Sequence, residues 1–147
     1  MKTTDRVQAN TAGNVNRDIE RKAARRVAQA AAAPTQVITR RIGELDEEWD
    51  IERAIEANAA TASLVGLTFG LLGRSRWFLL PAAVSGFLLQ HAVQGWCPPI
   101  PVLRRLGFRT SFEIEQERQA LKLIRGDYKS AAAGDADPED ILEAVQA

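Results

Sequence analysis

The residue of this sequence best suited to covalent chemistry is its single cysteine, Cys97. A cysteine reacts as its thiolate, which needs a base or positive charge nearby. Cys97 directly follows an apolar segment, and at the end of a helix the negative pole of the helix dipole disfavours an anion. His91 is the one candidate base, but six residues turn about 600° around a helix, which leaves the two side chains on different sides.

Arg104 and Arg105 would favour the thiolate only if the proline-rich segment after Cys97 folds back. We therefore predict no catalytic residue and no enzymatic activity, with Cys97 as a candidate thiol only. A small buried or interfacial side chain is the favoured interpretation, and a redox or persulfide-carrying thiol is the alternative. One cysteine and one histidine exclude an intramolecular disulfide, a multi-cysteine cluster and a two-histidine metal site, so we expect no cofactor and no metal.

Charge is distributed very unevenly along the chain. The 19 basic and 19 acidic residues balance, so the net charge names no partner, yet residues 57–96 contain only Arg74 and Arg76. These two flank Ser75 between apolar runs at 57–73 and 77–96. At 1.5 Å per residue the second run spans about 30 Å, the thickness of a bilayer's hydrocarbon core. We predict a transmembrane helical hairpin. The alternative is a hairpin buried in the core of a soluble protein. It is disfavoured because the remaining sequence is too polar to cover two helices that are apolar on nearly all sides.

Tryptophans and glycines support this interpretation. Trp77 and Trp96 bracket the second run, where aromatic side chains anchor a span at the membrane interfaces. Gly66 and Gly70 form a small-residue motif on the first run, and Gly86 belongs to a similar pair on the second. Small residues let two helices approach closely in lipid. We expect this contact within the hairpin, or alternatively between two chains.

The segment before the hairpin predicts two helices that meet at Pro34. A basic helix is expected over 17–33 and a helix with an acidic face over 36–56. No proline separates the second helix from the first span, so we expect it to run into that span. Its apolar positions are Ile38, Ile42, Leu45 and Trp49. We predict an antiparallel pair with Arg25 beside Glu44, Arg21 beside Glu47 or Glu48, and Arg17 beside Asp50. The alternatives for the basic helix are a solvated face, or contact with anionic lipid headgroups. No aromatic residues interleave its charges, so no nucleic-acid partner is expected.

The segment after the hairpin starts with three prolines, Pro98, Pro99 and Pro101, which predict an extended exit. One interfacial turn should follow, with Leu103 and Leu106 toward lipid and Arg104 and Arg105 toward headgroups. A capping box at Thr110 predicts a helix that ends near Gly126, and Asp137 precedes a short C-terminal helix. The expected organisation is a polar flank at 1–56, the hairpin at 57–96, the exit and an amphipathic helix at 97–128, and a linker with the last helix at 129–147.

The motif Gly95-Trp96-Cys97-Pro98, directly after a two-span hairpin, resembles the YgaP-like transmembrane-domain family of bacterial inner-membrane proteins. The resemblance covers roughly residues 50–110. It implies a two-helix membrane hairpin that dimerises and is often fused to a rhodanese domain. This sequence contains no rhodanese domain, so sulfur transfer by that mechanism does not carry over.

We therefore expect an all-α chain: an integral membrane hairpin with amphipathic cytoplasmic helices before and after it. Residues 1–20 lack an apolar core and predict no cleaved signal. Six arginines flank the hairpin and two lie in its turn, which predicts both termini in the cytoplasm. The resemblance implies that the membrane is a bacterial inner membrane. The expected role is a structural or interaction module, with the bilayer, a homo-oligomer and a protein bound by the flanking helices as partners. The alternatives are a sulfur-relay or redox accessory acting through Cys97, and small-solute passage through an oligomer.

Overall fold

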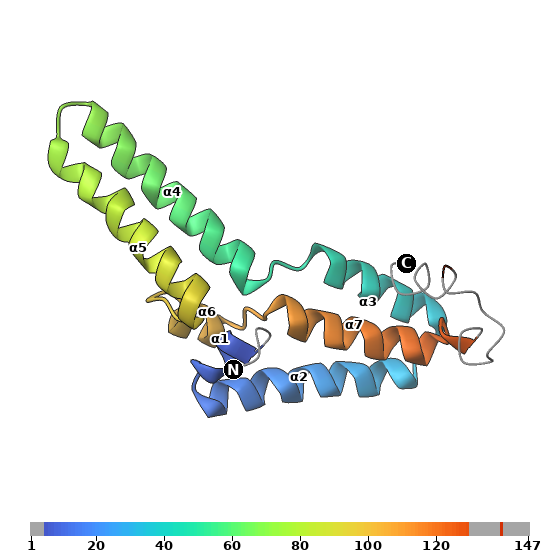
Figure 1. The fold of residues 1–147 in the computed structure, drawn as a ribbon. Coiled ribbons are helices and arrows are strands. Elements are labelled where there is room, and N and C mark those ends of the chain that lie inside the picture. Colours follow the sequence, from blue (N-terminus) through green and yellow to red (C-terminus); the bar gives the residue numbers. More distant parts are fainter. Residues whose placement is uncertain (1–4, 130–138, 140–147) are drawn as a thin grey trace. The chain divides into compact units, whose positions relative to one another are not determined.

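The structure is a computed structural model that describes residues 5–129 and residue 139, and all its regular elements in these residues are helices (Figure 1). The all-α prediction is therefore confirmed for this part of the chain. The predicted linker at 129–137 and the predicted C-terminal helix lie almost wholly outside the described residues. The elements are α1 (Arg6–Ala9), α2 (Gly13–Ala31), α3 (Thr35–Glu47), α4 (Ile51–Leu71), the 3-10 turn η2 (Ser75–Phe78), α5 (Leu79–Gln94), α6 (Ile100–Leu106) and α7 (Ser111–Arg125).

The chain divides into two compact units. Of the described residues, the first unit contains 5–19 and 49–112, and the second contains 20–48, 113–129 and 139. Helices α1, α4, α5 and α6 and the turn η2 belong wholly to the first unit.

Helices α4 and α5 lie side by side and antiparallel in the first unit, joined through η2 (Figure 1). Two glycines of α4 permit this approach. A Cβ placed on Gly66 would stand 2.6 Å from Cδ of Pro81, and one on Gly70 would stand 2.8 Å from the ring of Phe78. Gly86 takes no part in the contact, because nothing in the described residues lies within 4 Å of a Cβ placed there.

The boundaries of this pair differ from those expected. Helix α4 begins at Ile51, where the Asp50 carboxylate accepts a hydrogen bond from the main-chain N–H of Arg53 at 2.7 Å. This is an N-cap, and the prediction of one continuous helix over 36–56 is wrong. At the other end, residues Ser75–Phe78 form a 3-10 turn, so α5 begins at Leu79 and has 16 residues.

One helical stretch of the described residues, between Thr35 and Leu71, is long and apolar enough to cross a membrane. Only 22% of its most apolar window is buried, whereas the core helix of a soluble protein is mostly buried. Helix α5 is shorter than the roughly 17–25 residues of most spans.

The core of the first unit lies around the ends of α4 and α5 that are opposite their turn. We call these ends, residues 51–55 and 91–95, the foot of the pair. The buried apolar residues of this core are Val7, Ile51, Ala54, Ile55, Cys97, Ile100 and Leu103.

Residues 96–99 connect the foot to α6, which begins at Ile100, so the expectation of an extended exit through Pro101 is wrong. Pro99 precedes α6 and Pro101 lies in its first turn, where proline costs no hydrogen bond. The expected orientation of α6 is also wrong, because Leu103 and Arg104 are both buried rather than facing lipid and headgroups. Leu106 is exposed, as expected.

The second unit packs α3 with residues 20–31 of α2 and residues 113–125 of α7. Its buried apolar residues are Ala30, Ile38, Ile42, Leu45, Ile114 and Leu121. Three of the four apolar positions predicted for the helix over 36–56 are thus buried. The fourth, Trp49, lies after α3 in the first unit; it is 47% exposed, and its ring stacks with the Arg53 guanidinium, 4.4 Å from the ring centroid. The predicted ion pairs between α2 and α3 do not form in this structure. Glu44 pairs instead with Arg40 and Arg41 of its own helix.

Candidate functional site

The N-terminal helix α1 contacts the end of α5 at the foot. The Arg6 guanidinium donates to the carbonyl oxygen of Ala92, and Nδ2 of Asn10 donates to that of Gln94 at 2.9 Å. The last carbonyl groups of a helix have no partner within it, and a cation there is favoured by the helix dipole. Helix α1 therefore caps α5. Because α1 has only four residues, it is too short to show a helical period of apolar residues in the sequence.

Gly95 makes this contact possible. It is buried and adopts a left-handed conformation with φ of 71°. A Cβ placed on it would stand 2.7 Å from the main-chain carbonyl carbon of Arg6. Only glycine both adopts this conformation freely and admits the α1 backbone at this distance. The glycine of the Gly-x-Cys-Pro motif thus has a structural role at the foot.

The other helix of the pair is tied to the same place. The main-chain N–H of Ile51, at the start of α4, donates to the carbonyl oxygen of Arg109 at 2.8 Å. Nε2 of Gln8 donates to Oγ1 of Thr110 at 3.2 Å, which connects α1 to the same segment. Both helix ends at the foot are therefore held by main-chain and side-chain hydrogen bonds.

A polar pocket of about 230 Å³ lies at the foot. We use this name for the space lined by Arg6, Val7, Glu52, His91, Gly95, Thr110, Ser111 and Phe112. It combines a guanidinium, a carboxylate, an imidazole and two hydroxyl groups. Nδ1 of His91 is buried and has no hydrogen-bond partner among the described residues.

A second, apolar pocket of about 360 Å³ lies between the two helices next to Cys97. It is lined by Ile55, Asn58, Ala59, Ala62, Val84, Phe87, Leu88, Cys97, Pro98 and Pro99. Cys97 is 2% exposed, and burial raises the pKa of its thiol. A backbone hydrogen bond at Ile100 offsets only part of this rise. The thiolate that any cysteine chemistry requires is therefore disfavoured here.

The structure does not bring the residues discussed for thiol chemistry together. His91 lines the polar pocket and Cys97 the apolar one. Arg104 is buried and donates to the carbonyl oxygen of Phe108 at 3.1 Å and to Oδ1 of Asn16 at 2.9 Å. The guanidinium thus binds main-chain and amide oxygens of the first unit.

The two candidate anchor residues differ in their surroundings. The Trp77 ring lies 5.0 Å from the ring of Phe69 across the turn between α4 and α5, and it is 37% exposed. Trp96 is half-buried beside the foot. Trp77 lies two residues before the first residue of α5, and Trp96 lies two residues after its last.

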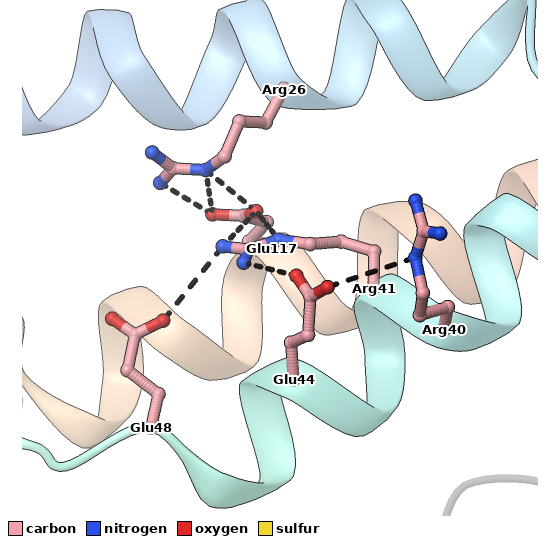
Figure 2. A network of polar contacts seen from close by, with 6 residues as sticks. All are labelled: Arg26, Arg40, Arg41, Glu44, Glu48 and Glu117. Atoms are coloured by element: carbon pink, nitrogen blue, oxygen red, sulfur yellow. Dashed lines mark hydrogen bonds and ion pairs between the residues drawn. The ribbon is translucent and has the colours of Figure 1, made fainter.

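The second unit contains a buried carboxylate that the sequence analysis did not identify. Figure 2 shows Glu117 of α7 between Arg26 of α2 and Arg41 of α3. Its side chain is completely buried, and its oxygens lie 2.7 Å from Nη2 of Arg26 and 3.1 Å from Nη2 of Arg41. Arg41 also contacts Glu44 at 3.0 Å and Glu48 at 3.8 Å.

A sequence signal for this carboxylate does exist. Glu117 follows Ile114 by three positions and precedes Leu121 by four, so it lies on the buried face of α7. An acidic residue at such a position needs cationic partners, because an isolated buried charge is very costly. The cluster joins all three helices of the second unit and has the character of a structural contact.

Comparison of the chain with family models, with curated proteins and with solved structures gave no match.

Proposed function

We propose that this chain is an integral membrane protein of the bacterial inner membrane, anchored by α4 and α5, whose helical flanks form a structural or interaction module. The observation that carries the proposal is the apolar surface of this pair. Leu71 is 79% exposed and Leu79 is 72% exposed. Further exposed apolar residues on the two helices are Leu64, Val65, Leu67, Phe69, Phe87, Leu89 and Val93. Soluble monomers rarely expose contiguous apolar patches of this extent.

The charges support the same proposal. From Ala57 to Leu103 the only charged side chains are Arg74 and Arg76, both at the turn between the helices. Helix α4 has 21 residues, of which the 15 from Ala57 to Leu71 carry no charge and give about 22 Å at 1.5 Å per residue, somewhat less than the roughly 30 Å of the hydrocarbon core. Six arginines flank the two apolar runs in sequence and two lie at the turn between them, which favours both termini in the cytoplasm.

The structure of the foot supports anchoring and interaction as the role. Helices α1 and α6 pack on it, so the pair is fixed in a folded base. The resemblance to the YgaP-like family supports a membrane hairpin that associates with a second copy. For the sulfur-relay alternative, the burial of Cys97 and the raised pKa of its thiol both count against an activated nucleophile.

A matched pair of substitutions tests the membrane anchor. Leu64 on α4 and Leu123 on α7 are both 65% exposed. Leu64→Arg should cost about 2.5–3.5 kcal/mol of insertion free energy if the position lies near the bilayer centre. We expect the wild type and Leu123→Arg to stay in the membrane pellet after alkaline carbonate extraction, and Leu64→Arg to be depleted from it. A wild-type protein that carbonate releases would contradict the proposal.

A further inference from the structure

We propose that a row of three arginines on α2 binds the headgroups of anionic phospholipids. Arg17, Arg21 and Arg25 recur at every fourth residue, which places them on one side of the helix, about 6 Å apart along its axis. All three are exposed, and none has a hydrogen bond or an ion pair with another described residue. Their charges are therefore available to an outside partner. We call this surface the arginine row.

The arginine row lies opposite the face of α2 that packs within the protein. Ile19 and Ala30 are buried, and at about 100° per residue they lie about 160° and 180° from Arg21 around the helix axis. Arg26, which is nearer to the packed side, already binds Glu117. The helix thus uses one arginine in its own packing and presents three others to the surroundings.

The exposed charges of α2 are mostly positive. Besides the arginine row they are Asp18, Glu20 and Lys22, so four cations accompany two carboxylates. Both carboxylates precede Arg21, and the residues from there to the end of the helix include no acidic side chain. A surface with excess positive charge attracts an anionic partner, and a guanidinium group can bind phosphate through two parallel hydrogen bonds.

The side chains around the arginine row fit a lipid surface better than a protein partner. Ala24 and Ala28 are exposed between and after the arginines, so no bulky side chain keeps the long guanidinium side chains from a flat layer of headgroups. No residue of α2, all of which the structure describes, exposes an aromatic or large apolar side chain. Contacts between proteins usually depend on such residues at their centre.

The start of α2 is held at the foot. Oδ1 of Asn16 accepts a hydrogen bond from Nη2 of Arg104 at 2.9 Å, and its Nδ2 atom donates to the carbonyl oxygen of Gln8 at 2.9 Å. The inference rests on the proposed membrane anchor, which places the foot at the cytoplasmic surface, since the last charge of α4 before its apolar run is Glu56. Anionic lipids make this surface negative, and the anchor raises their effective concentration around α2.

The test places the full-length protein in lipid nanodiscs that contain a quencher attached to lipid headgroups. In a Cys97→Ser background, a fluorophore at Ala24→Cys reports on the arginine row, and one at Ser75→Cys reports on the turn between α4 and α5. We expect position 24 to be quenched in discs that contain phosphatidylglycerol, and much less in discs of phosphatidylcholine alone. Raising the salt from about 0.1 M to about 1 M should relieve this quenching, because salt screens exposed charges.

Matched substitutions assign the effect to the arginine row. Each arginine at an anionic surface favours the bound state about fivefold, so Arg21→Gln should lower the ratio of quenched to unquenched label at position 24 by about that factor. Arg40→Gln is the control, because Arg40 is an exposed arginine that already pairs with Glu44. Glutamine and arginine have similar helix propensities, and thermal melting identifies any variant that has not folded.

The label at position 75 separates this inference from the membrane anchor. Quenching at position 75 in both kinds of disc, with none at position 24, would overturn the inference alone and assign the arginine row to solvent or to an acidic protein. Equal quenching at position 24 in the two kinds of disc, or unchanged quenching in a folded Arg21→Gln protein, would also overturn it. A label at position 75 that is quenched in neither disc would overturn the anchor and this inference together.

Discussion

Arg26 binds both oxygens of Glu117, with its Nη2 atom 2.7 Å from Oε2 and its Nε atom 2.9 Å from Oε1. The carboxylate side chain has no exposed surface, and Arg41 of another helix donates from Nε and Nη2 to Oε1. Bidentate arginine–carboxylate contacts combine charge with fixed geometry. A buried ion pair of this kind specifies which helices meet, and losing one partner leaves a poorly solvated charge.

We therefore expect Glu117→Gln to reduce the free energy of unfolding by about 3 kcal/mol, because two arginines lose their counter-charge. Glu47→Gln, at an exposed position of α3, should stay within about 0.5 kcal/mol of the wild type. Thermal unfolding of the purified proteins measures both changes. Equal stability of the two variants would show that the Glu117 cluster does not hold the second unit together.

Close packing of α4 on α5 predicts that leucine substitutions will differ in their effect on stability at three glycines. Gly66→Leu and Gly70→Leu should weaken the pair by about 1–3 kcal/mol or more, since each new side chain enters occupied space beside Pro81 or Phe78. Gly86→Leu should be neutral or stabilising, because its Cβ meets open space and leucine favours helix over glycine. Thermal stability in detergent ranks the variants. A Gly86 variant as damaged as Gly66→Leu would contradict the observed contact.

The contact between α1 and the foot predicts a large effect at Gly95. Alanine at Gly95 or Gly73 pays the cost of a left-handed conformation, about 1–2 kcal/mol, because φ is 71° and 89° respectively. Gly73→Ala meets open space, whereas Gly95→Ala also collides with the main chain of Arg6. Amide hydrogen exchange should show loss of protection in α1 for Gly95→Ala only. Unchanged protection would mean that α1 does not depend on this approach.

The thiol of Cys97, which follows the proposed span, should react slowly. Burial raises its pKa, so the rate of alkylation should increase only above the ordinary thiol pKa of about 8.5. The raised pKa also determines how the free energy of unfolding depends on pH. Above about pH 8.5 the unfolded thiol has lost its proton while the folded one retains it, so this contribution to stability falls as pH rises. Cys97→Ala should remove that dependence. An alkylation midpoint well below pH 8.5 would restore the sulfur-relay alternative.

Apolar periodicity in the sequence was enough to predict much of this architecture. The two runs around Arg74 and Arg76 appear as α4 and α5, and the spaced residues Ile38, Ile42 and Leu45 are buried. These features depend on neighbouring residues alone, because the spacing of apolar residues along a short segment indicates both a helix and its buried face.

Contacts between distant segments could not be predicted in the same way. Arg26 binds Glu117, 91 positions away along the chain. The sequence analysis had instead paired other arginines of the basic helix with acidic residues of the neighbouring helix. Helix α1 depends on contacts with α5 and has no local signal of its own. The start of α4 does have a local signal, because Asp50 is a suitable N-cap residue. The apolar and acidic pattern continues through Asp50, however, and this pattern predicted one continuous helix.

The central claim, that α4 and α5 cross a membrane with their turn outside the cytoplasm, is tested most directly by labelling cysteines in intact cells. In a Cys97→Ser background, Ser75→Cys reports on the turn, and Gln36→Cys reports on the exposed surface of α3. A membrane-impermeant maleimide should label position 75 in intact cells and position 36 only after lysis. Labelling of neither position before lysis would contradict a hairpin that crosses the membrane, and labelling of position 36 alone would reverse its orientation.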